Sequence, residues 1–346
     1  MAKKGLTNKT ALNLVQKERT WALCVGSGIS YPIFPLWGEL AKKIVQKFVP
    51  AAVSSFDELK NRMSPEVILQ AATEIAGRVH KDFSKDLADT LYENLFNGLS
   101  SQDVEVVKKC LTSIPGAVGV EWGRYLSIIQ GKTAKQTTAM SLAESILRLR
   151  DRNRAPSSIL TFNAEMLLGS FMNAIAHECY NEKKKFFDYM IGPTSYHGKE
   201  RIPYYFCHGV MPVPGSWNSA RAMFNANDRL VFLENEYLQL ANSSYSWQSS
   251  AFINTLSNNI VFFVGLSFVD PNIRRWLAWI QEERVKSLQK QNPGGVVSTS
   301  HYWIEKKPSS AIQQKMMEAS VGHLGIRIIW IDDWADVSKV LENCIA

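Results

Sequence analysis

The fold of this chain is decided by Thr20-Trp-Ala-Leu-Cys-Val-Gly-Ser-Gly-Ile-Ser30, an apolar run of strand character that opens into a Gly-Ser-Gly turn. Glycines 26 and 28 permit a sharp turn and a close approach of the backbone to a ligand. The N–H groups of such a turn suit a phosphate or pyrophosphate, and a helix-like stretch follows at about 36–48. The usual G-x-G-x-x-G spacing is absent, because Pro32 and Pro35 stand where its helix would already run. Taken alone, the stretch is also compatible with an ordinary loop.

Composition places the chain among globular proteins. Its 346 residues are 46% hydrophobic and 21% charged. This length and this hydrophobic content are enough for a substantial core in one domain or two. No apolar run is long enough to span a bilayer, and the amino terminus lacks the core of a signal peptide. Five cysteines are scattered without a C-x-x-C pair, which argues against a disulfide framework and a structural zinc site. We therefore expect a reduced, cytoplasmic protein without a metal or a membrane span.

The net charge of +7 raises the question of nucleic-acid binding. The basic residues are dispersed, however, and the densest runs at 148–154 and 183–185 have the pattern of solvated loops and helix ends. This distribution argues against direct binding of nucleic acid. A phosphate-rich small ligand or an acidic partner protein accounts for the charge equally well.

Strand-type runs recur along the chain with helices between them. The predicted strands lie at 20–25, 158–162, 203–207, 230–233, 259–264, 301–304 and 326–331. The predicted helices around them lie at about 8–19, 37–48, 164–180, from 234 onward and at 271–286. Alternating buried strands and helices predict an α/β fold with a Rossmann-like, doubly wound parallel sheet.

The stretch from 54 to 153 contains no convincing strand pattern. Helical spacing recurs through it instead, for example at 87–96 and 140–149. We therefore expect a helical insertion subdomain at 54–153, set between the first two strands of a single domain that spans 1–346.

Polar residues close four of the predicted strands. They are Gly26-Ser-Gly28, Asn163, His208-Gly209 and Gly265-Leu-Ser267. Ligands of an open parallel sheet bind beyond the carboxyl ends of its strands. The predicted topology therefore brings all four sets to one edge of the sheet.

These strand ends together resemble the Sir2-like (sirtuin) superfamily, and more closely its bacterial branch of zinc-free NAD+ hydrolases in anti-phage defence. Four segments carry the resemblance in family order: Gly26-Ser-Gly-Ile-Ser30 with Pro32, Pro35 and Trp37; Leu160-Thr-Phe-Asn163; Phe206-Cys-His-Gly209; and Phe262-Phe-Val-Gly-Leu-Ser-Phe-Val-Asp-Pro-Asn-Ile273. The resemblance spans roughly residues 20–280 and implies the Sir2-like form of the Rossmann-like fold.

Two departures from the protein-deacylating sirtuins shift the expected reaction. Those enzymes carry a zinc ribbon held by two pairs of cysteines, and this chain has no such pairs. It also has Ile33-Phe-Pro-Leu-Trp37 in place of their Asp-Phe-Arg. The resemblance therefore implies hydrolysis of NAD+ itself, as substrate, rather than deacylation of a peptide, and it implies no metal.

The resemblance also implies roles for individual residues. Asn163 is expected to hold the ribose hydroxyls and the attacking water, and His208 to take a proton from that water. Eight further residues are expected to bind NAD+: Gly26, Ser27, Gly28, Ile29, Ser30, Gly265, Ser267 and Asp270.

Each of these residues also has a purely structural interpretation. Asn163 precedes a predicted helix and suits its cap, and His208 suits an ordinary loop. Gly265 and Ser267 could simply end a strand, and Asp270 before a proline is a common helix start. Cys207, next to His208, is expected to face the core rather than to act as a nucleophile, because adjacent strand residues face opposite sides.

The resemblance finally implies an NAD+ glycohydrolase that depletes cellular NAD+ during abortive infection. Such an activity must be gated, so we expect a homo-oligomer or a separate activating protein, with a HerA-type ATPase preferred over a short Argonaute. Three alternatives remain open: a protein deacylase or ADP-ribosyltransferase, a non-catalytic module that senses NAD+ or ADP-ribose, and a subunit that binds nucleic acid.

Overall fold

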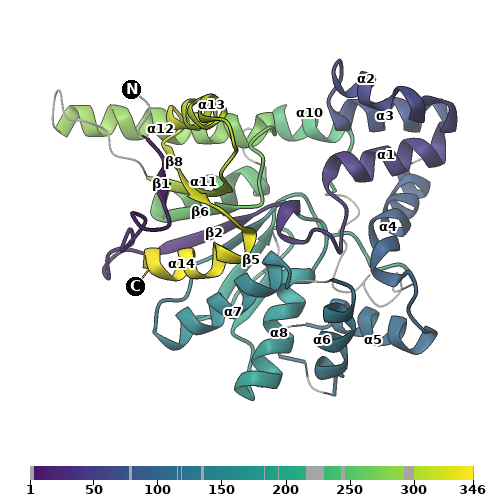
Figure 1. Ribbon diagram of the computed structural model, residues 1–346, viewed down its shortest axis with the longest axis horizontal. Helices are drawn as coiled ribbons and strands as arrows, with labels where there is room; N and C mark the ends of the chain where they lie inside the picture. Colours follow the sequence, from purple (N-terminus) through teal and green to yellow (C-terminus); the bar gives the residue numbers. More distant parts are fainter. Residues whose placement is uncertain are drawn as a thin grey trace.

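A computed structural model of the chain describes residues 4–77, 80–114, 116–117, 119–133, 136–182, 184–193, 195–215, 230–242, 246–291 and 300–345. These residues form one sheet of eight strands, all parallel, in the order β1-β8-β7-β6-β2-β3-β5-β4 (Figure 1). The strands are β1 (Leu6–Thr7), β2 (Trp21–Val25), β3 (Ile159–Thr161), β4 (Phe187–Met190), β5 (Ile202–Phe206), β6 (Ile260–Val264), β7 (His301–Lys306) and β8 (Ile326–Ile331). The predicted α/β fold is confirmed.

Strand β2 lies near the centre of the sheet, and its residues show why the sheet is covered on both faces. All five of its residues are buried. Trp21, Leu23 and Val25 belong to one hydrophobic core, and Ala22 and Cys24 belong to a second. Since successive side chains of a strand point to opposite faces, a run that is apolar at every position needs a helical layer on each side.

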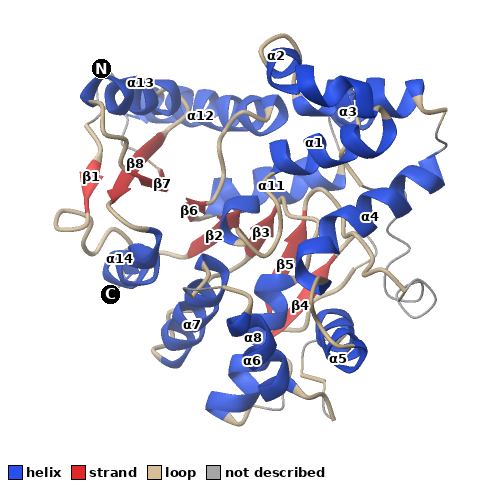
Figure 2. Cartoon of the chain, turned by 45° about the vertical axis from the view of Figure 1, so that its right-hand side comes forward, coloured by secondary structure: helices blue, strands red, loops and turns tan. Residues whose placement is uncertain are grey.

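Helices from distant parts of the chain supply these two layers (Figures 1 and 2). The helices that pack into the first core include α7 (Thr138–Asp151), α8 (Leu167–Tyr180) and α14 (Val337–Ile345). The second core is covered by α11 (Trp247–Asn258), α12 (Pro271–Gln291) and α13 (Ala311–Gly322). Helices on both faces of a parallel sheet make the fold doubly wound.

The described residues between β2 and β3 are helical, without a strand. They form α1 (Trp37–Phe48), α2 (Phe56–Lys60), α3 (Pro65–Ile75), α4 (His80–Phe96), α5 (Ser101–Thr112), α6 (Trp122–Gly131) and α7. Helix α1 contacts α3 and α4, whereas α7 contacts α8 and α14 in the layer over the sheet. The division of the chain into a domain with an insertion at 54–153 stays a prediction.

The predicted helix at 8–19 is wrong. Its backbone groups bond to distant partners instead: the N–H groups of Asn13 and Val15 donate to carbonyls of α14, and the Arg154 guanidinium donates to carbonyls of 15–17. Just before this segment, β1 pairs with β8. Tertiary hydrogen bonds here outweigh a weak helical preference.

The strand predicted at 230–233 is also absent, and both edge strands, β1 and β4, were missed. Residues 230–233 are buried but irregular, because the N–H groups of Phe232 and Leu233 donate to the Glu236 carboxylate at the start of α10 (Glu234–Asn242). Strand β4, unpredicted, pairs with β5 at the end of the sheet. Its four residues are too few to give a distinct alternation in sequence.

Candidate functional site

The order of the strands reverses on either side of β2. The chain builds the sheet outward through β3 on one side and through β6, β7 and β8 on the other. A crevice opens at such a switch point, beyond the carboxyl ends of the two strands that flank it. The loops that follow β2 and β6 meet there.

These two loops pack backbone to backbone. Gly26 N–H donates to the carbonyl of Val264 at 3.1 Å, and Gly28 N–H donates to that of Gly265 at 3.1 Å. A Cβ atom on Gly26 would lie 2.6 Å from the Gly265 oxygen, and one on Gly28 would lie 2.9 Å from the Gly265 Cα. Gly265 itself has a φ of +68°, which favours glycine.

The physical reason for the glycines therefore differs from the predicted one. Gly26 has a φ of −128°, which any residue adopts, so the chain does not need glycine there for a sharp turn. It needs the missing side chain because the loop after β6 lies against it.

The same packing leaves few backbone donors for an anion. The N–H group of Gly26 donates to the last carbonyl of β6, and those of Gly28, Ile29 and Ser30 donate to carbonyls within the two loops. Among the five N–H groups of 26–30, only that of Ser27 has no acceptor in the described part of the chain. Of the N–H groups of this turn that were expected to suit a phosphate, only that of Ser27 therefore remains without an acceptor within the described residues.

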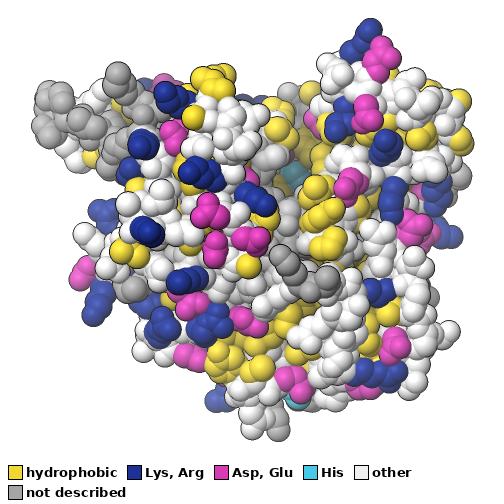
Figure 3. All heavy atoms as spheres, in the orientation of Figure 1, with side chains coloured by type: hydrophobic (Ala, Val, Ile, Leu, Met, Phe, Trp, Pro, Cys, Tyr) yellow, Lys and Arg dark blue, Asp and Glu magenta, His cyan; other side chains and the backbone are white. Residues whose placement is uncertain are grey.

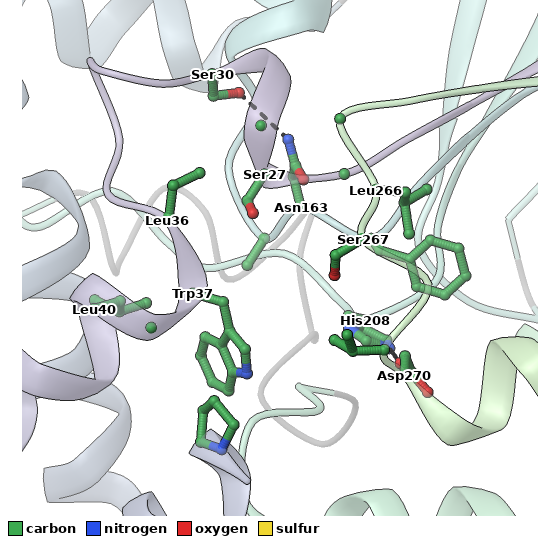
Figure 4. A pocket seen from close by; sticks show the side chains of 18 of the residues that line it. Ser27, Ser30, Leu36, Trp37, Leu40, Asn163, His208, Leu266, Ser267 and Asp270 are labelled. Carbon is green, nitrogen blue, oxygen red and sulfur yellow. Dashed lines mark hydrogen bonds and ion pairs between the residues drawn. The ribbon is translucent and has the colours of Figure 1, made fainter. Parts of the chain in front are cut away.

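A cavity of about 470 Å³ lies over these loops (Figure 4). On the face drawn in Figure 3, the surface is hollowed beside the α1 region, and hydrophobic side chains gather at the hollow. Nine of the ten predicted site residues line the cavity: Gly26, Ser27, Gly28, Ser30, Asn163, His208, Gly265, Ser267 and Asp270. The tenth, Ile29, is buried beneath the turn at 1% exposure. Asn163 and His208, from different strand ends, thus share one cavity.

Asn163 is held by a carboxylate that the sequence analysis missed. Its amide Nδ2 donates to Glu165 Oε1 at 2.8 Å and to Ser30 Oγ at 3.3 Å. The Ser30 hydroxyl donates to the same Glu165 oxygen at 2.6 Å, and the Leu167 N–H donates to the other one. With its amide nitrogen so engaged, Asn163 has its Oδ1 buried without a partner in the described residues.

This network decides what Asn163 can do. The alternative role as a helix cap is wrong, since α8 begins at Leu167 and it is Glu165 that accepts the Leu167 N–H. The fixed amide presents Oδ1 as an acceptor for a hydroxyl group or a water. Burial raises the pKa of Glu165, and the hydrogen bonds from Ser30, Leu167 and Asn163 oppose that rise.

His208 is held between two aromatic rings and faces a carboxylate. Its ring makes edge contacts with Phe162 at 4.9 Å and Tyr237 at 5.4 Å, measured between centroids. Its Nε2 lies 3.4 Å from Asp270 Oδ2, and the two side chains are only 10% and 13% exposed. Neither of these two atoms has a hydrogen-bond partner among the described residues, so Asp270 Oδ2 lies beside the ring as a close neighbour rather than as a hydrogen-bond acceptor.

Asp270 has two functions in the structure. Its Oδ1 accepts the N–H groups of Asn272 at 2.7 Å and Ile273 at 3.3 Å, which caps α12. Its Oδ2 faces His208. The predicted helix start is confirmed. The predicted ligand contact stays a prediction, and the structure places the Asp270 side chain in the cavity wall beside His208.

The loop between Ser267 and Asp270 is held under strain. Phe268 has a φ of +53°, in the left-handed region that disfavours bulky residues. Its buried ring packs against Phe263 at 5.0 Å and Trp303 at 4.9 Å. These aromatic contacts hold the loop in the shape that aims Ser267 and Asp270 at the cavity.

Cys207 faces away from the cavity. It follows β5 directly and is fully buried in the second hydrophobic core, whereas Phe206 belongs to the first core on the other face of the sheet. Burial raises the pKa of its thiol, so no thiolate forms near neutral pH. The prediction that Cys207 belongs to the core is confirmed.

Two further lining residues bear on function and were not predicted. Glu165 stands two residues after Asn163, a spacing that could have marked it as its partner. Glu305 lies near the carboxyl end of β7 and was missed because a charged residue at a strand end is usually solvated. Trp37, noted in the first motif, also lines the cavity and contacts the ring of Phe232 at 5.1 Å.

Fold and cavity place the chain among doubly wound α/β proteins, whose ligands bind in the crevice at the switch point of the sheet. A family described as SIR2-like domain matches residues 170–329, which include His208, the loop after β6 and Glu305. The match supports membership of the chain in the Sir2-like superfamily. Domains of this kind use NAD+, so the match indicates an NAD-related activity. A search of curated proteins found no match to the chain.

Two negative observations concern the described residues alone. None of their helices is both long and apolar enough to cross a membrane. They contain no group of three or more His, Cys, Asp or Glu side chains that could hold a metal ion. The expected absence of a metal stays a prediction.

Proposed function

We propose that this protein is an NAD+ glycohydrolase, which cleaves NAD+ to nicotinamide and ADP-ribose. The observation that carries the proposal is one cavity at the switch point that three side chains line together. Asn163, with its amide held in place, and the neighbouring side chains of His208 and Asp270 all border this cavity.

The reaction suits these groups. The bond between nicotinamide and ribose breaks with its electron pair going to the nicotinamide nitrogen, which is already cationic, so no general acid is needed. Water adds to the anomeric carbon of the resulting oxocarbenium-like centre. Asn163 Oδ1 accepts a hydrogen bond from the water or a ribose hydroxyl, and His208 takes the proton. Asp270 stabilises the imidazolium that forms.

The first experiment compares nicotinamide release by the wild type with that of Asn163→Ala and His208→Ala. Both variants are expected to lose at least about 100-fold in turnover, the range for general-base and positioning groups. His177→Ala is the matched control, because this histidine lies on α8 outside the cavity and pairs with Glu178. Melting temperatures establish folding, and turnover equal to wild type in either cavity variant overturns the assigned roles.

The products separate hydrolysis from group transfer. Free ADP-ribose is expected, whereas an acetylated or protein-linked ADP-ribose would indicate a deacylase or transferase. Stabilisation by NAD+ without any nicotinamide release would indicate a sensing module.

The biological role belongs to the same proposal. The resemblance in the four strand-end segments supports a cytoplasmic effector of abortive infection that depletes NAD+, gated by homo-oligomer assembly or by a separate activator. A HerA-type ATPase is the first partner to test and a short Argonaute the second. Purified chain mixed with each partner should form a complex and gain NAD+ turnover; neither complex nor gain counts against the gating scheme.

A further inference from the structure

A second cavity, of about 750 Å³, lies at the amino ends of the strands, opposite the cavity that Asn163 and His208 line. Three neighbouring strands begin at it, because its lining includes Thr20 before β2, Ile260 on β6 and His301 on β7. Residues between 279 and 284 on α12 also line it, and Figure 1 shows this helix extending past the side of the sheet on which β2 begins. The volume lies within the range of small-molecule sites, about 300–1,000 Å³.

Three basic side chains from separate elements meet at this second cavity. Arg19 precedes β2, Arg284 lies on α12, and His301 begins β7. Burial lowers the pKa of Arg284, and the charge of Arg19 lowers it further. The two guanidinium groups are therefore close enough to repel each other, and an anion bound beside both of them would relieve that repulsion.

The carboxylates that line the second cavity do not offset this positive charge. Glu283 is 77% exposed and pairs with Lys286 at 3.1 Å. Neither Glu283 nor Glu18 is among the charges that shift the pKa of Arg284. The carboxyl end of α11 also lines the cavity, but the carbonyl of Asn258 there accepts the Thr20 hydroxyl at 3.3 Å. The local charge therefore favours an anionic ligand.

Two neutral donors add to the arginines. His301 Nδ1 accepts the N–H of Val261 at 3.3 Å, so the ring carries its proton on Nε2. Burial lowers the pKa of His301 to about 3, which keeps the imidazole neutral near pH 7 and leaves Nε2–H as a donor. The Ser300 hydroxyl oxygen is buried and has no hydrogen-bond partner within the described residues. Guanidinium, hydroxyl and ring N–H groups are donors that the oxygens of a phosphate accept.

The second cavity also offers an aromatic ring. Trp279, on α12, lines the cavity and is 42% exposed, which leaves much of its indole uncovered by the described residues. The Arg275 guanidinium lies 5.4 Å from the centroid of this ring. An indole next to phosphate donors suits the base of a nucleotide, because a base can stack on an aromatic side chain.

We propose that the second cavity binds a nucleoside phosphate. Arg19, Arg284 and the Ser300 hydroxyl hold its phosphate groups, and its base lies against Trp279. The site is independent of the cleavage of NAD+, since none of these four residues lines the cavity of Asn163 and His208.

Isothermal titration calorimetry tests the phosphate contacts, with inorganic pyrophosphate titrated into the full chain. Arg19→Gln and Arg284→Gln are each expected to weaken its binding at least about tenfold, and Ser300→Ala about threefold to tenfold. Lys60→Gln is the matched control, because Lys60 is a cation that lines the other cavity. This control should leave the affinity unchanged.

ADP, titrated in the same way, tests the contact with the base. Trp279→Leu is expected to weaken the binding of ADP at least about tenfold and to leave that of pyrophosphate unchanged. Arg19 and Trp279 are both exposed, so replacing them should not unfold the chain. Melting temperatures check this for every variant.

The outcomes are decisive in each direction. Pyrophosphate that does not bind the wild type, or that responds to Lys60→Gln and not to the two arginine variants, overturns the site. Equal binding of ADP by the wild type and Trp279→Leu overturns the nucleoside as ligand. Absence of nicotinamide release from NAD+ would remove the glycohydrolase and leave this site standing.

Discussion

Replacing Gly265 with alanine tests whether the glycines at the switch point serve backbone packing. The φ of +68° places an alanine in the left-handed region, which costs an L-residue about 1–2 kcal/mol. The new Cβ would also lie 2.7 Å from the backbone nitrogen of Ile29 and 2.9 Å from its Cγ2. Because a backbone atom is in the way, the loops must separate, and forced repacking of this kind costs about 1–3 kcal/mol.

The expected loss for Gly265→Ala is therefore about 2–5 kcal/mol in the free energy of unfolding. Gly77→Ala is a matched control, since Gly77 has a φ of +62° and a Cβ added there would meet no atom within 4 Å. It should lose only the conformational part, about 1–2 kcal/mol. The difference between the two variants isolates the contact between the loops.

Urea unfolding at constant pH measures both losses, with equal m-values as the check that both variants unfold in the same way. Calorimetry with ADP-ribose should also show weaker binding for Gly265→Ala and unchanged binding for Gly77→Ala. Equal destabilisation of the two variants would refute the argument, because the loop contact would then contribute nothing.

Three further predictions concern the same site. Glu165→Gln should lower the rate of nicotinamide release at least about tenfold, because the hydrogen bonds that fix Asn163 are rearranged; an unchanged rate would show that Glu165 does not position the amide. Asp270→Asn should lower kcat/KM about 10–100-fold through His208. Its melting temperature should change little, since asparagine also caps α12. Asp270→Ala should lower both kcat/KM and the melting temperature, because alanine cannot cap the helix. Glu305→Gln should be more stable than the wild type at pH 8 and equal to it near pH 4. The folded pKa of about 7 exceeds the ordinary 4.5, so the wild type loses stability as the pH rises from 4.5 to 7. The full pKa shift corresponds to a loss of about 3 kcal/mol in the free energy of unfolding of the wild type. Because the Glu305 side chain is partly exposed, the expected loss is about 1–3 kcal/mol. Urea unfolding at both pH values measures the difference, and an equal difference at both would contradict the pKa argument.

Local sequence predicted the main elements of the sheet well, because their signals are local. Strand β2 is apolar at every position and ends in a glycine turn, and β6 has the same character. Once the strands are parallel, their carboxyl ends must share an edge, which is why Asn163 and His208 line one cavity although they lie 45 positions apart in the sequence.

The failures have a common cause. Residues 8–19 have helical spacing, yet Arg154 and α14 bind their backbone groups in an irregular path. Residues 230–233 are apolar like a strand, yet the Glu236 carboxylate takes their N–H groups. In both segments the decisive hydrogen bond comes from a partner that a periodicity argument does not consider.

By itself, the sequence determined the alternation of strands and helices, the parallel sheet, and the set of polar residues at its edge. Those features depend on hydrophobic periodicity and turn chemistry within about ten residues. Only the tertiary structure decided that Gly28 is a glycine because of Gly265, that Asp270 faces His208, and that Glu305 lies at the far end of the same cavity. Each of these relations joins residues from different strands, and their distance is set by the closing of the sheet rather than by neighbours in the chain.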